Sequence, residues 1–458
     1  MLTKELLTPY SLGHLGLVGA YIQEAGIIEK IDSRLPQASS TSGHLTHGQV
    51  VALMILNVLG DTTRPLHMAH NFFEAKDVAA MLGIEFQSAW LNDDVIDRTM
   101  GDLYNYGLTP LLSQISSDIL QDLGCKAESV GVDSISFHYQ GSGQKSTDDG
   151  CQEEGETDVY CFEPHKISVI CGSKLDADPE LDQIMEQMVI DKATGIPLFM
   201  ELENGTSGDR KASGRMEQVF KNFRKQSGDG YAYLSGDPAL YSEENIVSME
   251  ETGIRFITRV APCKSKSTKK FIEDHRDDEL EPIDDVNQGK IYKVEDCGVQ
   301  QIWLLVQSNA TKKRSFFIVA TNDLQREWQP QELLSLCQSH DNVERGFRFL
   351  KFPDFRADPV FVSQSERVQT LFMLMSLGLA VFSALDWKLC HAMKERKVKL
   401  KNQVGKLTDR ISMRFVFQIF SPVITVNLES GERLVYHVSP EAQQILELLG
   451  DKYQAIYV

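Results

Sequence analysis

Three acidic residues lie in contexts where a carboxylate could do chemistry. Asp133 interrupts the apolar, strand-like run SVGVDSISF, Asp237 ends another in YAYLSGDP, and Glu344 lies within SHDNVERGFRFLKFPDF. An ionised carboxylate on a buried strand is costly unless it is paired, hydrogen-bonded or bound to a metal. Asp133 is therefore a stronger functional candidate than an acid in a loop. The Gly-Asp-Pro text around Asp237 also fits a plain turn, with the aspartate as a helix cap.

The stretch around Glu344 gathers basic side chains beside one acid. If it is helical, Glu344, Arg348 and Lys351 share one stripe, next to an apolar stripe that would face a core. Two interpretations stay open for this stretch taken alone. In the first, it is a surface helix capped by Asp341, and Glu344 completes a capping box. In the second, Glu344 binds a metal ion beside cations that hold a phosphate backbone.

Length and composition indicate a globular protein of two or three domains. The chain has 458 residues, of which 42% are apolar and 24% charged, as in ordinary folded proteins. Its eight cysteines form no C-x-x-C pair or Cys/His cluster, which predicts free thiols in a reducing compartment and no zinc site. The first residues, MLTKELLTPYSLGHLG, lack the pattern of a secretory signal. We therefore expect a cytoplasmic protein.

Charge is spread unevenly along the chain. A formal net charge of −19 disfavours a protein that coats nucleic acid indiscriminately, because phosphate repulsion would oppose the encounter. Residues 388–414, however, carry nine Lys/Arg against two acids. This basic stretch is either a solvated face or a phosphate track. Acids gather in 146–158 and 273–285, which we interpret as solvated loops.

Apolar periodicity divides the chain into four regions. Residues 1–122 are expected to form an all-helical N-terminal domain, because apolar residues recur at helical spacing in LVGAYIQEAGIIEKI and HGQVVALMILNVLG. Short strand-like runs over 126–260 indicate an α/β or mixed sheet with helices. After a lysine-rich link, CKSKSTKK, a β-rich insertion is predicted within 261–325. Helices over 330–458 would complete the core and add the basic C-terminal region.

Two segments have a second interpretation that the sequence disfavours. The run VQTLFMLMSLGLAVFSAL, residues 368–385, is uncharged and barely long enough to cross a bilayer, but it contains four polar side chains. We predict a helix buried inside a large domain. In LNDDVIDRTMGDL, the acids Asp93, Asp94 and Asp97 suggest a metal site, whereas Asn92 before an apolar periodic run is an ordinary helix cap. We predict the cap.

Taken together, the three acids and their contexts resemble the DDE transposases of bacterial insertion sequences, in the branch with the signature Y-x2-R-x3-E-x6-K. Glu344 and Lys351 fit the E-x6-K part in VERGFRFLKFPDF, and SERVQTLFMLMSLGLAV follows as is typical of the branch. VGVDSISF and YLSGDPALYSEENI resemble the contexts of the first and second acids. LGHLGLVGAYIQEAGIIEKID and LNDDVIDRTMGDLYNYG resemble a helical domain that precedes the core in one subgroup. The resemblance spans nearly the whole chain.

The resemblance implies a ribonuclease-H-like core interrupted by the β-rich insertion. Asp133 would lie on its first strand, Asp237 at the end of its fourth, and Glu344 on a helix after the insertion. These three would be the catalytic residues and the ligands of two Mg²⁺ ions, with Mn²⁺ as a substitute. The residues expected to contact DNA are Lys351, Arg345, Arg348 and His340.

The resemblance also implies a function. The protein would cleave the ends of its own insertion sequence and transfer the freed 3′-hydroxyls to target DNA. Its partner would be double-stranded DNA, namely the terminal inverted repeats and the target, and a homodimer would bring two ends together. The helical N-terminal domain is the expected place for terminal-repeat recognition. We expect the protein in the cytoplasm, associated with the nucleoid and not with a membrane.

Two departures leave alternatives open. Cys337 and His340 stand where the signature has Tyr and Arg, and a neutral histidine grips phosphate less well than a guanidinium does. A second hypothesis is therefore a domesticated or decayed relative that binds DNA without cleavage. A third is a structure-specific nuclease on the same fold, which would cut unrelated DNA as readily as cognate ends.

Overall fold

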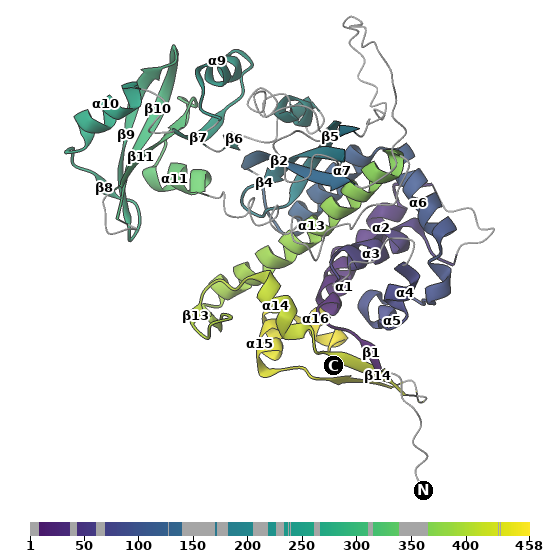
Figure 1. Cartoon of the computed structure of the whole chain (residues 1–458). Coiled ribbons are helices and arrows are strands. Elements are labelled where there is room, and N and C mark those ends of the chain that lie inside the picture. The colour runs from purple at the N-terminus through teal and green to yellow at the C-terminus, as the bar shows by residue number, and fades with distance from the viewer. Residues whose placement is uncertain are drawn as a thin grey trace, which may run out of the picture. The chain divides into compact units, whose positions relative to one another are not determined.

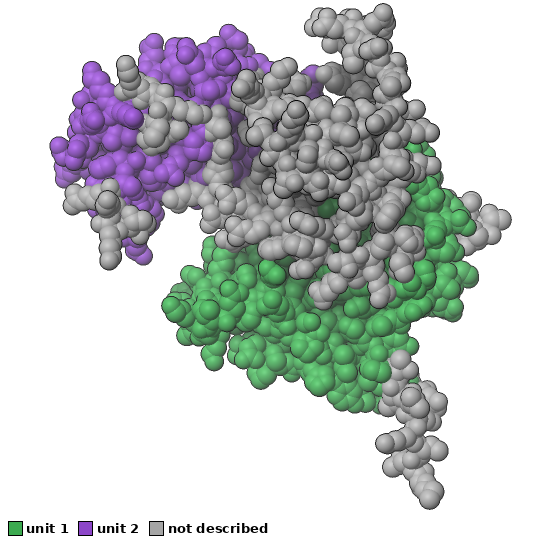
Figure 2. All heavy atoms as spheres, viewed as in Figure 1, with its two compact units in different colours: residues 1–125, 137–184, 348–458 green, residues 126–136, 185–347 purple. Residues whose placement is uncertain are grey.

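The computed structural model divides the chain into two compact units (Figure 2). Unit 1 comprises residues 1–125, 137–184 and 348–458, and unit 2 comprises residues 126–136 and 185–347. The residues that the structure describes are 9–36, 44–60, 69–126, 128–139, 170–171, 182–204, 219–225, 233–236, 238, 240–260, 266–309, 315–338, 365–428, 430 and 432–458, without the side chains of 133–139, 170–171, 182–185, 203–204, 266–267 and 365.

The N-terminal part of unit 1 is helical, as predicted (Figure 1). Its helices are α1 (Leu15–Glu24), α2 (Ile27–Asp32), α3 (His47–Val58), α4 (Ala69–Phe73), α5 (Val78–Leu82), the 3₁₀ helix η2 (Ser88–Trp90), α6 (Asp93–Tyr106) and α7 (Leu108–Asp122). The predicted cap is confirmed, since the Asn92 side chain accepts a hydrogen bond from the backbone N–H of Val95 at 3.0 Å. Thr46 and Gln49 form a reciprocal capping box that starts α3.

One long helix, α13 (Ser365–Glu395), packs against α1, α3, α6, α7 and α15 of unit 1. By length and composition alone it could cross a membrane, but 89% of its apolar window is buried inside the protein. The prediction of a buried core helix is therefore confirmed. The helix continues beyond Leu385 because Leu389 and Met393 keep the apolar spacing and are both buried.

The C-terminal segments of unit 1 pack against its first elements. They are α14 (Met413–Phe420), β14 (Ile424–Asn427), β15 (Arg433–Tyr436), α15 (Pro440–Leu449) and α16 (Asp451–Ile456). Strand β1 (Pro9–Ser11) pairs antiparallel with β14, which pairs with β15. Buried Asp77 joins this sheet to a helix, because one carboxylate oxygen caps α5 and the other accepts a 2.6 Å hydrogen bond from Thr425.

The large sheet has a mixed core. Its strands are β2 (Ser129–Tyr139), β3 (Ile170–Cys171), β4 (Asp182–Asp191), β5 (Pro197–Asn204), β6 (Tyr233–Gly236) and β7 (Phe256–Val260). The order is β4-β2-β6-β7, with β3 and β5 both paired to β4. The β2–β6 and β6–β7 pairs are parallel. This order fits a ribonuclease-H-like core, and the predicted fold class is confirmed.

The β-rich insertion extends the same sheet. Its strands are β8 (Glu281–Pro282), β9 (Asn287–Asp296), β10 (Val299–Ser308) and β11 (Ser315–Thr321). Strand β11 pairs antiparallel with β7, so the order continues as β7-β11-β10-β9-β8. Cys297 and Gly298, both with positive φ, form the two-residue turn between β9 and β10. The insertion thus lengthens the core sheet, and Figure 1 shows helix α10 (Lys266–His275) beside these strands.

Strand β4 and helix α10 are among the elements that were not predicted from sequence. Strand β4 has glutamate and glutamine at positions 186 and 187, both fully buried, which hides its apolar pattern. Helix α10 begins inside the segment that was expected to be a lysine-rich link. It forms because Phe271 packs against Trp303 and Tyr292, with ring centroids 5.1 Å and 5.3 Å apart.

Candidate active site

The structure describes only part of the predicted site. Asp133 lies in β2 as part of the described backbone, and its side chain lies outside the described residues. Six further predicted site residues also lie outside them: Asp237, His340, Glu344, Arg345, Arg348 and Lys351. The structure describes the framework that leads into these positions. It consists of β2, β6, β7 and helix α11 (Pro330–Gln338).

The register of β2 against β6 relates two of the predicted acids. In this parallel pair, Ser129 lies opposite Tyr233 and Gly131 lies opposite Ser235, so partners are 104 positions apart in the chain. Asp133 and Asp237 are separated by the same 104 positions. Strand β6 ends at Gly236, directly before Asp237.

One face of these strands is covered by α11. Side chains alternate along a strand, so Tyr233 and Ser235 point to the same face of β6. Ile257 of β7 lies opposite Ser235 and therefore shares that face. Tyr233 and Ile257 pack in one buried cluster with Leu333 and Cys337 of α11. The helix that leads toward position 344 is thus anchored on this face.

A buried lysine lies on the same face. The Lys192 side chain is 1% exposed, and its Nζ donates a 2.6 Å hydrogen bond to Oγ of Ser235. Burial raises the pKa of the Cys337 thiol. Lys192 and Arg259 act in the opposite direction and lower this pKa, but the effect of burial is larger. The sequence did not single out Lys192, because a lysine after a strand resembles an ordinary turn residue. Lys192 and Arg259 therefore place basic groups near Cys337 on this face.

A hydrogen-bonded network fixes the start of β6. The hydroxyl of Tyr233 donates a 2.6 Å hydrogen bond to Asp323, which follows β11. Arg255 forms an ion pair with the same carboxylate at 3.4 Å. The side chain of Asn322 accepts a hydrogen bond from the backbone N–H of Phe256 at 3.0 Å. These contacts join β6 and the start of β7 to the residues that follow β11. They therefore fix the ends of the strands that lead to the predicted site.

Cys337, at the signature tyrosine position, is a core residue. Its side chain is 4% exposed and belongs to the cluster under α11. Burial raises the pKa of its thiol, so the thiol stays protonated at neutral pH. A buried, neutral thiol offers no direct contact to a DNA phosphate.

The turn between β4 and β5 holds an acid with a perturbed pKa. One oxygen of the Asp191 carboxylate accepts hydrogen bonds from the backbone N–H and the hydroxyl of Thr194, at 2.8 and 2.6 Å. The other oxygen, Oδ1, is buried and has no hydrogen-bond partner. Burial raises the pKa of Asp191 from 3.8 to about 6. The charged carboxylate is therefore a cost to the folded state at neutral pH.

This cost predicts a pH-dependent effect of Asp191→Asn. The folded pKa lies above the unfolded one, so the stabilisation that the protonated acid contributes is fully present below pH 3.8 and is lost as pH rises through about 6. Asparagine keeps an acceptor for Thr194 and carries no charge. We expect the variant to gain about 3 kcal/mol relative to wild type between about pH 4 and pH 8.

Urea unfolding of both proteins across this pH range measures the gain. Exposed Asp274, replaced by asparagine, is the control and should show no such trend. A stability difference between wild type and Asp191→Asn that does not change with pH would contradict the raised pKa of Asp191.

Among the residues whose side chains the structure describes, no group of three or more His, Cys, Asp or Glu could hold a metal ion.

Two parts of the chain match protein-family models. Residues 182–380 match the family model described as the transposase DDE domain. Residues 8–117 match a model described as a domain of unknown function, DUF4277. Residues 182–380 are thus similar to the transposase DDE domain, and this match supports a transposase function. Positions 237 and 344 lie inside the matched range, whereas Asp133 precedes it.

One solved transposase structure is similar to the chain. A solved piggyBac transposase synaptic complex with hairpin DNA is similar at 10% identity and a TM-score of 0.38, covering 86% of this chain and 79% of that one. No curated protein matches the chain.

Proposed function

We propose that the protein is a DDE transposase of a bacterial insertion sequence, which cleaves the ends of its element and transfers the 3′-hydroxyls to target DNA. Asp133, Asp237 and Glu344 are the proposed catalytic residues. The match to the transposase DDE domain supports the class of enzyme. The observation that carries the assignment of residues is the register of β2 against β6.

The register supports a meeting of the two aspartates. Consecutive Cα atoms are about 3.8 Å apart, so Asp237 cannot lie far from the end of β6. If the parallel register continues for two residues beyond Gly131 and Ser235, Asp133 and Asp237 become neighbours on adjacent strands. Adjacent strands are spaced by about 4.8 Å, which is close enough for two carboxylates to share a ligand.

The alternation of side chains supports a common face for all three acids. Asp133 is two residues after Gly131, and Asp237 is two after Ser235, so both would point to the face that α11 covers. Glu344 follows Cys337 of α11 by seven residues, and Cys337 packs beside Tyr233 on that face. We propose that the segment after α11 brings Glu344 to the same edge of the sheet.

The chemistry of these residues fits Mg²⁺. Three carboxylates are hard oxygen donors, and three such groups brought together would repel one another without a cation. When bound, Mg²⁺ would activate a water or 3′-hydroxyl and stabilise the leaving oxygen of an in-line displacement. We propose two ions, with Mn²⁺ as a substitute. The chain's own acids would hold these ions, and the buried amine of Lys192 lies on the same face.

The basic residues near Glu344 have a separate task. Arg345 and Arg348 would grip phosphates with two parallel hydrogen bonds, while Lys351 would act as a point charge and His340 as a weaker donor. A homodimer would hold two element ends at once. We propose that this complex acts on nucleoid DNA in the cytoplasm.

A cleavage assay tests the proposal. The substrate is duplex DNA from the regions that flank the coding sequence, which would contain the terminal repeats. We expect nicks at the repeat ends that require Mg²⁺ or Mn²⁺ and do not appear with scrambled DNA. Equal cutting of scrambled duplex would instead identify a structure-specific nuclease.

One observation favours a second candidate, a relative that binds DNA without cutting it. Cys337 is buried and neutral at the signature tyrosine position, so this side chain offers no phosphate contact there. Specific binding to the flanking DNA without metal-stimulated nicking would support this candidate.

A further inference from the structure

The basic stretch near the C-terminus folds into a small hairpin on unit 1. Strands β12 (Leu400–Lys401) and β13 (Leu407–Thr408) pair antiparallel. The side chain of Asn402 shapes the turn between them, accepting hydrogen bonds from the backbone N–H groups of Val404 and Lys406 at 3.1 and 3.0 Å. Gly405 takes a positive φ of 74°. We call residues 397–408 the basic hairpin.

The cations of this hairpin face solvent. Lys397, Lys399 and Lys406 are exposed, and within the described part of the chain none of their ammonium groups has a hydrogen bond or ion pair. Some neighbouring cations differ in this respect. Lys388 forms an ion pair with Glu24 at 2.5 Å. Arg396 and Arg410 also have hydrogen-bond or ion-pair partners. Lys397, Lys399 and Lys406 are therefore among the lysines that remain available to a ligand.

The hairpin also exposes apolar side chains among its cations. Val404, in the turn, is 70% exposed, and Leu407 is 67% exposed. Most other large apolar side chains that the structure shows as exposed are well below these values. These side chains could be covered when a ligand binds the cations around them.

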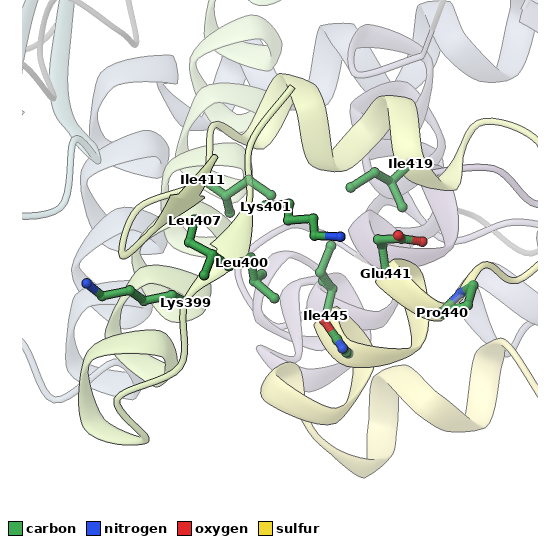
Figure 3. Close-up of a pocket in the computed structure, with 10 residues that line it drawn as sticks. Lys399, Leu400, Lys401, Leu407, Ile411, Ile419, Pro440, Glu441 and Ile445 are labelled. Atoms are coloured by element: carbon green, nitrogen blue, oxygen red, sulfur yellow. The ribbon is translucent and has the colours of Figure 1, made fainter. Parts of the chain in front are cut away.

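The hairpin is anchored at its base. Leu400 is buried, and a hollow of about 210 Å³ lies between the hairpin and the helices α14 and α15 (Figure 3). Its lining includes Leu400, Ile411, Ile419 and Ile445. Figure 3 shows Lys401 extending across this hollow and Lys399 pointing away from it. Leu400 thus anchors the hairpin beside the hollow, while Lys399 points away from it.

We propose that the basic hairpin contacts duplex DNA, with Lys397, Lys399 and Lys406 on phosphates and Val404 inserted at the edge of a groove. Cations neutralise phosphates, and apolar side chains on narrow elements wedge against base steps in the minor groove. A stable protein interface buries about 800 Å² on each partner, more than so short a hairpin offers. The proposal rests on the proposed function, for which it names a DNA-contacting surface outside unit 2.

The test measures binding without catalysis. Wild type and a triple variant, Lys397→Gln, Lys399→Gln and Lys406→Gln, are titrated against a fluorescent mixed-sequence duplex in EDTA at several salt concentrations. Losing three phosphate contacts should lower the salt slope of log K by about 2.7 and weaken binding roughly tenfold or more. The matched control replaces exposed Lys269, Lys270 and Lys452 with glutamine and should bind like wild type.

A second variant separates the apolar contact from charge. Val404→Ser should weaken binding several-fold, about fivefold, with an unchanged salt slope, because no cation is removed. An unchanged slope in the lysine variant would overturn the proposal. So would loss of self-association by the lysine variant with DNA binding intact, which would assign the hairpin to a second copy of this chain. Failure of cleavage by wild type would not affect this result, because no metal is present in the binding assay.

Discussion

Asp237→Asn protein should fail to cut terminal-repeat DNA while still binding it. The change removes one charged metal ligand and keeps the shape of the side chain. We expect cleavage to fall by about three orders of magnitude or more, equivalent to roughly 4 kcal/mol of transition-state stabilisation. Asp133→Asn and Glu344→Gln should lose as much. Because the acids act as one unit, a double variant should be hardly worse than a single one.

Single-turnover cleavage with Mg²⁺, and binding in EDTA, separate catalysis from recognition. Two exposed acids provide matched controls, Asp274→Asn and Glu251→Gln, which should cut like wild type. If any of the three acid variants cuts at the wild-type rate, that residue is not a catalytic ligand. If wild type itself only binds, the domesticated relative becomes the better description.

Replacing glycines of unit 1 with alanine should change the free energy of unfolding in opposite directions, depending on the space around each glycine. A Cβ at Gly19 would collide with the backbone carbonyl of Met81, and one at Gly48 with that of Ile28. Backbone atoms cannot move aside cheaply, so Gly19→Ala and Gly48→Ala should each cost about 3 kcal/mol. Gly101 lies in α6 with nothing within 4 Å, and Gly101→Ala should instead add about 0.5 to 1 kcal/mol.

Thermal and urea unfolding of the three variants measure these effects, with the same residue change in each. Gly101→Ala serves as the control for the alanine itself. Gly19→Ala protein as stable as wild type would contradict the close approach of α1 to α5, and the same result for Gly48 would contradict that of α2 to α3.

Much of the fold could be predicted from local sequence. Strands such as β2 and β10 carry β-branched apolar runs, and helices such as α6 carry both a cap and apolar periodicity. Strand β4 was missed because two fully buried polar side chains interrupt its pattern. Strand β1 could not be found locally, since Pro9–Ser11 becomes a strand only by pairing with β14, more than 400 positions away.

The predicted site depends on the resemblance more than on local pattern. The acids could be picked out by their contexts, but no local feature relates Asp133 to Asp237. The register of β2 against β6 provides a relation that only a folded chain can show. Lys192 was missed for a similar reason, because its burial and its bond to Ser235 arise from strands distant in sequence.

The central claim is that Asp133, Asp237 and Glu344 hold the same divalent ions. Fe²⁺ in place of Mg²⁺, with ascorbate and peroxide, generates hydroxyl radicals that cut the polypeptide backbone beside the bound metal. Mass spectrometry of the fragments should find cuts near positions 133, 237 and 344 together, and none in the protein that lacks all three carboxylates. Cuts at other places, or cuts that persist in that variant, would contradict the account.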